Sequence, residues 1–371
     1  MSMDALYCDA PMLIHDLPSD YVQSTSRCCD DVRKKGVLSC RQPDRDDYVR
    51  EGKGYDLNNK AIKNVSEALP IYIPILGNGV KKLPLSVDHP YVGVRLRDLF
   101  PNAVRVRHGV PEFIESSPID LNLLGSGFFG EGKKLLFYSD KDLLIEGINK
   151  KSYKQPIYND LKRAGVDITT TPDFSVNEGS CVFGQVVNTN RTLAVGEKMS
   201  NEGLLVIPNM FAIHTCLVEM WVNYLNKNTH IKYVSINCQR QNSQCDREKL
   251  IWYIHEVLSK VDRPVHVILH GYPIRNKKYL KALRGLAAQI HFADSAPYCY
   301  ATQRFTFFIY DSKTKELVLK DAGDEGRSPE EKSKMIIQSI SAVEEYLKEN
   351  FYTYSLCSPL NMCVLTTEEV S

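Results

Sequence analysis

Polar side chains that can move protons or attack a carbon centre recur in this chain directly after short apolar runs. One run, QIHFADS (289–295), passes through Phe292 and Ala293 and then stops on a carboxylate, Asp294. The other polar run ends are His108, Asp140, Asp173, Asn209, Asn237 with Gln239, and His270. These carboxylates and histidines could act as acids, bases or nucleophiles if the fold brings the run ends together.

Eight runs of this kind, rich in β-branched and aromatic residues, occur at 69–79, 103–109, 134–140, 167–173, 204–209, 233–239, 265–271 and 289–295. Their ends lie 24 to 36 residues apart, which is the length of a strand, a loop and a helix. Intervening segments such as HTCLVEMWVNYLNKN and DREKLIWYIHEVLSKV carry apolar residues at helical spacing. Eight strand–helix units predict an α/β fold, a (β/α)8 TIM-like barrel, whose strands all end at one mouth.

Two further elements follow the barrel. The segment FTFFIYDSKTKELVLKD predicts a hairpin, and SPEEKSKMIIQSISAVEEYLKENF predicts a helix with Ser328 as N-cap and Pro329 at its first position. We therefore expect an N-terminal extension over 1–65, a catalytic barrel over 66–304, and a C-terminal hairpin and helix over 305–371 that pack on the barrel.

Composition limits the classes of partner. The formal net charge of +1 at pH 7 excludes a uniformly basic nucleic-acid coat but permits a local basic patch. No segment has the pattern of a signal peptide or a membrane span, and the eleven cysteines are scattered, so we expect a cytoplasmic protein with reduced thiols. An N-terminal group lacks CxxC spacing, which favours structural thiols over a metal site. Its members are Cys8, Cys28, Cys29 and Cys40.

Carboxylates at the mouth of a barrel suit the cleavage of a glycosidic bond. One carboxylate can stabilise or attack the oxocarbenium-like sugar carbon while a second moves the proton of the leaving group. Bonds between two sugars and bonds between a sugar and a base both qualify.

Five segments, in order, resemble the tRNA-guanine transglycosylase superfamily. The first, IYIPILGNGVKKL (71–83), resembles its first strand with a PVGT-type turn, and KLLFYSD (134–140) resembles its strand that ends on an Asp at a DSGG turn. VSINCQ resembles its IVQG strand, VILHGYP its LMGVG-P segment, and IHFADSAPYCYATQR its FDCV-PTR-AR segment. The five segments span residues 70 to 304, so the resemblance implies the same barrel.

The resemblance also implies roles for residues on the rim. Asp294 would attack the anomeric carbon of the nucleoside, and Asp140 would handle the proton near the base. The base edge would be contacted by Asp173, Asn237 and Gln239, and further substrate-binding candidates on this rim are Asn209, His270, Gly271 and Tyr298. An attacking carboxylate must be ionised, so we expect a nearby donor or positive charge that keeps the pKa of Asp294 low.

Departures from the family pattern point toward DNA rather than tRNA. The DSGGFQ motif reads SDKDLL here, so Asp142 competes with Asp140 for the proton role, and the CxCxxC-plus-His zinc site after the nucleophile is absent. The likeness is then to the DNA-acting, base-exchanging branch and to glycosylases that flip a modified base out of the stack. A second resemblance, carried by FYSDKD, TPDFS and VIPN, is to a domain family of unknown function frequent in phages and bacteria, which suggests phage defence or phage DNA modification.

DNA requires contacts to its phosphates. The segment RNKKYLKALR (275–284) follows the seventh run, and its basic residues could meet a phosphate backbone, although a solvated helix face has the same composition. The candidates are Arg275, Lys277, Lys278 and Arg304, with Arg105 and Arg107 as further positions. Three tyrosines beside these segments, Tyr272, Tyr298 and Tyr300, could stack on a flipped base or fill the top of the barrel.

Three hypotheses from different classes remain. The first is an enzyme that releases or exchanges a nucleobase in DNA without a metal or organic cofactor. The second is a metal-dependent barrel hydrolase with His108, His214, His270 and Asp294 as ligands, although the first strand lacks an HxH pair. The third is a non-catalytic binding protein on a barrel scaffold, whose activity would survive Asp294→Asn. A sugar-cleaving enzyme that acts on free glycosides is a further alternative to the first.

Overall fold

The structure is a computed structural model of the 371-residue chain. It describes residue 57 and the ranges 60–107, 110–114, 118–125, 127–140, 142–152, 157–174, 176, 182–212, 214–239, 244–323 and 328–352. Several predictions fall outside these ranges, namely those on His108, on the N-terminal cysteines Cys8, Cys28, Cys29 and Cys40, and on most of the extension over 1–65.

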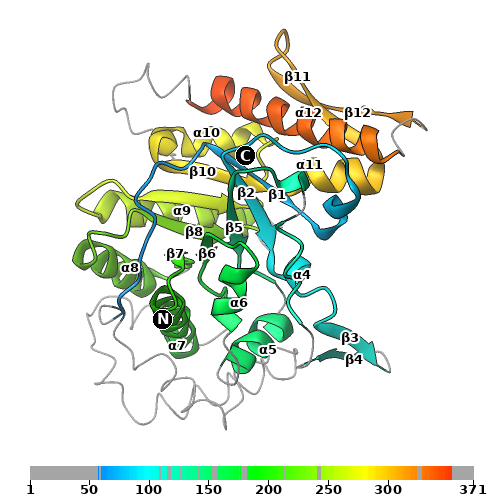
Figure 1. The fold of residues 1–371 in the computed structure, drawn as a ribbon. Coiled ribbons are helices and arrows are strands. Elements are labelled where there is room, and N and C mark those ends of the chain that lie inside the picture. Colours follow the sequence, from blue (N-terminus) through cyan, green and yellow to red (C-terminus); the bar gives the residue numbers. More distant parts are fainter. Residues whose placement is uncertain are drawn as a thin grey trace.

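An eight-stranded parallel sheet forms the centre of the molecule (Figure 1). In chain order its strands are β1 (Tyr72–Leu76), β2 (Tyr91–Arg95), β5 (Lys133–Phe137), β6 (Ile168–Thr170), β7 (Leu205–Ile207), β8 (Tyr233–Asn237), β9 (His266–His270) and β10 (Ile290–Asp294). They are paired in the order β7-β6-β5-β2-β1-β10-β9-β8, so β1 and β10, which are first and last in the chain, are neighbours. This order is that of a TIM-like barrel, as predicted.

The barrel closes between β7 and β8 through a short seam. An isolated parallel bridge joins Asn209 to Ser235. The Ser235 N–H donates to the Pro208 carbonyl at 2.8 Å, and the Met210 N–H donates to the Ser235 carbonyl at 2.7 Å. The ring of strands is therefore nearly complete, and this part of the sheet has no long free edge that would leave backbone groups unpaired.

Alternation along the strands separates an inner and an outer core. The inner side carries one apolar cluster that includes Ile73, Ile75, Leu135, Phe137, Ile168, Ile207, Ile268 and Ala293. Residues of the opposite parity, such as Phe292, belong to a larger cluster between the sheet and the helices. Both faces are buried, which explains why these strands have nearly continuous apolar sequences.

Helices follow most of the strands and cover the outside of the barrel (Figure 1). They are α5 (Asp142–Ser152), α6 (Ile157–Arg163), α7 (Val182–Asn201), α8 (Thr215–Lys227), α9 (Gln244–Lys260), α10 (Lys277–Leu283) and α11 (Ala296–Cys299), with the short α4 (Leu96–Leu99) after β2. The helices predicted within 214–228 and 246–261 are present as α8 and α9. The basic segment 275–284 contains α10, which continues into a 3-10 turn.

The predicted second barrel strand, 103–109, is wrong. Val104–Arg107 (β3) pairs antiparallel with Val110–Phe113 (β4) in a separate two-stranded hairpin that projects from the barrel (Figure 1). The second barrel strand is instead β2, whose sequence YVGVR is buried up to the half-buried Arg95. The alternating VRVR pattern is typical of a strand with one solvated face, and Val106 is indeed 67% exposed.

The C-terminal hairpin and helix are present as predicted. β11 (Thr306–Asp311) pairs antiparallel with β12 (Glu316–Asp321), and α12 (Pro329–Leu347) packs against β11. The Ser328 hydroxyl accepts from the Glu331 N–H at 3.1 Å, and Pro329 occupies the first helical turn. The Glu344 carboxylate reaches the His89 ring at 3.0 Å, which ties α12 to the loop that leads into β2.

A pair of histidines lies on the inner side at the N-terminal half of the barrel. His266 Nδ1 and His291 Nε2 are 3.0 Å apart, and His291 Nδ1 lies 2.8 Å from the Pro70 carbonyl. The Tyr233 ring stacks on His266 with ring centroids 4.9 Å apart. Burial lowers the pKa of His291 to about 4, and it also lowers the pKa of His266.

This histidine pair predicts a stability that falls on acidification. A histidine with a folded-state pKa of about 4 takes up its proton more readily after unfolding, so its contribution is complete above its ordinary value of 6.5 and is lost toward pH 4. At ~1.4 kcal/mol per pKa unit, about 2 kcal/mol should be lost between pH 7.5 and pH 5. In urea titrations at these two pH values, His291→Gln should lose less stability than the natural chain. An equal loss in both proteins would contradict this prediction.

Candidate active site

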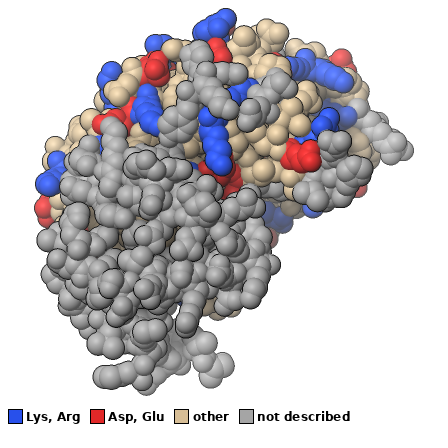
Figure 2. All heavy atoms as spheres, turned by 90° about the horizontal axis from the view of Figure 1, so that it is seen from below, with Lys and Arg blue, Asp and Glu red and all other residues tan. Residues whose placement is uncertain are grey.

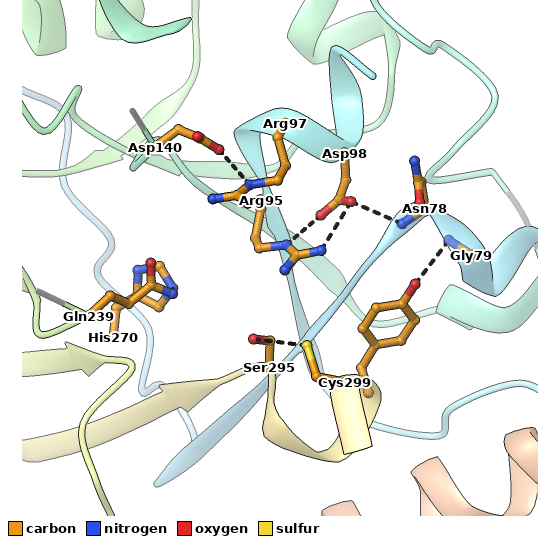
Figure 3. A network of polar contacts seen from close by, with 11 residues as sticks. Asn78, Gly79, Arg95, Arg97, Asp98, Asp140, Gln239, His270, Ser295 and Cys299 are labelled. Atoms are coloured by element: carbon orange, nitrogen blue, oxygen red, sulfur yellow. Dashed lines mark hydrogen bonds and ion pairs between the residues drawn. The ribbon is translucent and has the colours of Figure 1, made fainter. Parts of the chain in front are cut away.

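The C-terminal ends of the strands bring several polar side chains to one rim, and Figure 3 shows a network of them. Arg95 ends β2, Arg97 lies in α4, Asp140 follows β5, and His270 ends β9. Gln239, in the loop after β8, reaches the same group. Residues from segments up to 175 positions apart thus meet at the barrel mouth, which is where barrel enzymes hold their catalytic groups.

Arg95 is fixed by a buried carboxylate. Its Nε donates to Asp98 Oδ2 at 2.7 Å, and its Nη2 donates to Asp98 Oδ1 at 3.2 Å. Asp98 also accepts from the Asn78 N–H at 3.2 Å, so the loop after β1 helps to hold the pair. Burial alone lowers the pKa of Arg95, but the hydrogen bonds and charge of Asp98 outweigh it and raise that pKa above its ordinary value.

Arg97 forms the second ion pair of the rim. Its Nε donates to Asp140 Oδ2 at 2.7 Å, and its side chain is 51% exposed while that of Asp140 is only 5% exposed. Asp140 is thus held under the guanidinium group. In this structure the predicted proton-handling carboxylate has a cationic partner that the sequence did not indicate.

His270 lies at the top of the inner core. Its ring centroid is 4.5 Å from that of Phe137, and the Gln239 Nε2 atom lies 3.1 Å from His270 Nε2. Burial, together with the positive charges of Arg95 and Arg97, lowers the pKa of His270 to about 3, so the ring is neutral. Gly271 has φ +74, and a Cβ there would lie 2.5 Å from Gln239 Cγ, so this glycine allows Gln239 to approach the histidine.

Asp173 follows β6 and Asn237 ends β8, and the two side chains contact each other above β7, which lies between these strands. Asn237 Nδ2 donates to Asp173 Oδ2 at 2.8 Å, and Asn237 Oδ1 accepts from the Gln239 N–H at 3.1 Å. Asn209 is bound to the sheet itself, because its amide donates to the Thr171 carbonyl. The structure therefore brings Asp173, Asn237 and Gln239 together, and their contact with a base edge stays a prediction. The Asn209 amide group supports the barrel wall.

Asp294 lies at the rim but on the other side of its strand. Ala293, its neighbour, belongs to the inner cluster, and alternation places Asp294 on the side of Phe292, which packs on Tyr272 and Phe351 in the outer core. The Asp294 carboxylate accepts from the Ala296 N–H at 3.1 Å. Strand alternation thus places Asp294 on the face of the sheet opposite to that of Arg95 and His270.

The expected low pKa of Asp294 is not found. Burial raises the pKa to about 6, and the N–H groups of Ala296 and Ser295 only partly oppose that shift. The expectation failed because, among the residues that the structure describes, no cation adds to the two backbone donors, so the desolvation of the charged form dominates. A carboxyl group with this pKa can exchange a proton near neutral pH.

Tyr298 and the predicted nucleic-acid contacts have partners within the chain. The Tyr298 ring packs against Gly77, and its hydroxyl accepts from the Gly79 N–H at 3.1 Å, so the buried ring is held by the loop after β1 and does not stand free to stack on a base. Lys277 pairs with Glu316 at 2.8 Å and Lys278 with Glu248 at 3.7 Å. The guanidinium groups of Arg275 and Arg304 lie over the rings of Phe308 and Tyr300.

Surface charge is mixed on the face seen in Figure 2. Lys and Arg side chains are spread among Asp and Glu over the described part of this face and do not form one continuous positive patch.

Within the described ranges no helix is long and apolar enough to cross a membrane. Those same residues include no group of three or more His, Cys, Asp or Glu side chains placed to bind a metal, and His108 of the predicted ligand set lies outside them.

Arg95, Arg97 and Asp98 were not among the predicted site residues, because the predicted second barrel strand lies 12 residues too late. The sequence does contain a signal for them: YVGVR is an apolar run that begins just after a Pro, and LRD follows it immediately. Had this run been chosen, Arg95 would have been its polar end in the same way as Asp140 or His270.

Removing the Asp294 charge should stabilise the protein. Its raised pKa means that the folded state holds the carboxylate ionised at a cost that is complete above pH 6 and declines toward pH 4. Asn can accept the same N–H donors, so Asp294→Asn should gain on the order of 2 kcal/mol at pH 7.5 in urea titrations, and about half as much at pH 5. Asp262→Asn, an exposed site in the turn before β9, is the control that should change neither value. A destabilised Asp294→Asn at pH 7.5 would contradict the prediction.

No protein-family model and no curated protein sequence matches the chain. The barrel architecture by itself supports many unrelated chemistries.

Proposed function

We propose that this protein is an enzyme that breaks the N-glycosidic bond of a nucleobase in DNA, either by hydrolysis or by exchange for another base. The site is the C-terminal mouth of the barrel. Asp294 is the attacking carboxylate in this proposal, Asp140 is the carboxylate that serves the leaving base, and Asp173, Asn237 and Gln239 contact the base edge.

One observation carries the proposal: the rim holds three carboxyl groups in three different environments. Asp140 is paired with Arg97, Asp173 accepts a hydrogen bond from Asn237, and Asp294 is half-buried with a pKa raised to about 6. Glycosidic cleavage needs carboxyl groups whose environments differ, because one must attack or stabilise the sugar carbon while another manages the proton.

The chemistry balances with these groups alone. A carboxylate oxygen of Asp294 forms a bond to the sugar C1′ as the C1′–N bond breaks, and the electron pair of that bond leaves with the base, which takes up a proton from the carboxyl group of Asp140. A water molecule or an incoming base then gives up a proton to Asp140 as it attacks C1′, the ester bond breaks, and the Asp294 carboxylate is restored. The amide groups of Asn237 and Gln239 offer both donors and acceptors for the polar edge of a base.

Asp294 must turn toward the mouth for this reaction. Its carboxylate now lies on the outer side of β10, where it accepts from its own turn. It is the last residue of the strand, so rotation about its side-chain bonds is the change required, and catalytic contacts commonly tighten only when substrate is bound. Asp140 and Asp173 lie on the rim without such a change, so they are the variants to compare.

A panel of single substitutions tests the activity. The natural chain is incubated with unmodified DNA, tRNA and DNA that carries modified bases, with and without added free base, and released base and abasic sites are measured by mass spectrometry. Asp294→Asn should reduce base release at least 1000-fold, because the group that attacks C1′ is lost. Asp262→Asn, at the opposite end of the barrel, should retain full activity.

The other outcomes of this panel are equally informative. Abasic sites without added base indicate hydrolysis, whereas product that forms only with added base indicates exchange. If Asp294→Asn stays active while Asp140→Asn or Asp173→Asn is inactive, the attacking role belongs to the latter residue. Absence of release from every polymer, with activity on free glycosides, would overturn the DNA substrate and keep only the bond type.

The pH profile separates two roles of Asp294. As an attacking group it must be ionised, so kcat/KM should rise with pH through about 6 and level off above 7. As a proton donor it would give the opposite slope, a fall through the same region. Initial rates between pH 4.5 and 8.5 on the active substrate distinguish the two, and a flat profile would contradict both.

A further inference from the structure

Two arginines of the rim have donor groups that the chain itself does not use. The Nε and Nη2 of Arg95 bind Asp98, and the Nε of Arg97 binds Asp140. Within the described part of the chain these are the hydrogen bonds of the two guanidinium groups. The Nη1 group of Arg95 and both terminal nitrogens of Arg97 therefore have N–H donors left for a ligand.

The two guanidinium groups lie close together at the mouth. In Figure 3 the Arg97 guanidinium lies beside Asp140, on the side where Gln239 and His270 lie, and the Arg95 guanidinium turns toward Asp98. Each contributes a positive charge that disfavours protonation of His270, despite its own aspartate partner. Both guanidinium groups are therefore near enough to His270 to act on its ring, and the neutral imidazole adds no charge of its own.

The two guanidinium groups are held in place before any ligand arrives. Asp98 is buried and fixes Arg95 through two hydrogen bonds, while the Asn78 N–H fixes Asp98. A Cβ at Gly77 would lie 2.9 Å from Arg95 Nη2, so the glycine lets the loop after β1 close against the guanidinium. Pre-ordered arginines lose little conformational freedom on binding, and their planar forks suit the oxygens of phosphate.

We infer that Arg95 and Arg97 form a phosphate subsite at the barrel mouth, which binds a phosphate attached to the sugar of the nucleotide whose base is released. This inference rests on the proposed function for the identity of the nucleotide, whereas the anion site stands on the arginine geometry. A substrate with a phosphate next to the reacting sugar should then bind better than the corresponding nucleoside.

Binding is measured by isothermal titration calorimetry on the full chain at low and at high salt. The probes are inorganic phosphate, the four deoxynucleoside 5′-monophosphates, the corresponding nucleosides, and dinucleoside phosphodiesters. At least one monophosphate should bind about tenfold or more tightly than its nucleoside, and added salt should weaken it because Arg97 is half exposed. Equal affinities of nucleotide and nucleoside, or no binding by any phosphate, would overturn the inference.

Variants locate the site. Arg97→Gln should remove most of the phosphate-dependent gain, and Arg95→Lys, which keeps the charge but not the fork, should remove part of it. Arg163→Gln is the matched control, because Arg163 also pairs with an aspartate, is 70% exposed and lies at the end of α6 away from the mouth. Unchanged binding in Arg97→Gln would overturn the assignment, and thermal unfolding of each variant shows whether it is folded.

Two further arms separate the sources and the two proposals. Phosphodiesters that bind as tightly as the monophosphates indicate the DNA backbone, whereas binding of monophosphates alone indicates free nucleotides, and both results support the subsite. Phosphate binding retained in Asp294→Asn, without base release by the natural chain, would leave the subsite standing and refute the proposed function. Base release that is indifferent to Arg97→Gln would refute the subsite and leave the function.

Discussion

Closure of the barrel is the constraint on which the rest of the structure depends. Parallel strands bury both faces, and an open sheet would leave β7 and β8 as two unpaired edges. The seam that joins them is short, with Ser235 as donor and acceptor between Pro208 and Met210. Once the ring is closed, strand ends far apart in sequence face one mouth, and the polar residues that follow them become neighbours.

Charge pairing then determines the character of the mouth. Two arginines from one strand end are oriented by two aspartates, one of which comes from the next strand along the sheet. Each pair removes two charges from water, a cost that good geometry and further hydrogen bonds must offset. The result is a set of fixed donors beside a neutral histidine. Asp294, which is half-buried and held by backbone N–H groups, is by contrast a carboxyl group that titrates near neutral pH. A rim with both kinds of group can bind an anion and move a proton.

The fold could be read from the sequence where a strand is apolar on both faces. Segments such as VHVILHG and QIHFADS are long enough, and sufficiently apolar, to identify β9 and β10 directly. The segment AVRVRHG was wrongly predicted as a barrel strand, because β-branched residues that alternate with arginines also suit an exposed hairpin. The local sequence does not show whether the strand packs against helices or faces solvent. That single misplacement shifted the second strand, and with it Arg95 and Arg97, out of the predicted site.

The sequence by itself determined the type of fold, the ends of most strands and the residue types available at the rim, because apolar periodicity and strand-ending polar residues are local properties. Only the tertiary structure decided which of these residues meet. Strand register and alternation turned Asp294 to the outer side of β10, placed Arg97 over Asp140, and joined Asn237 to Asp173. Burial reversed the expected pKa of Asp294, because the desolvation of a charge depends on everything packed around it and not on its neighbours in sequence.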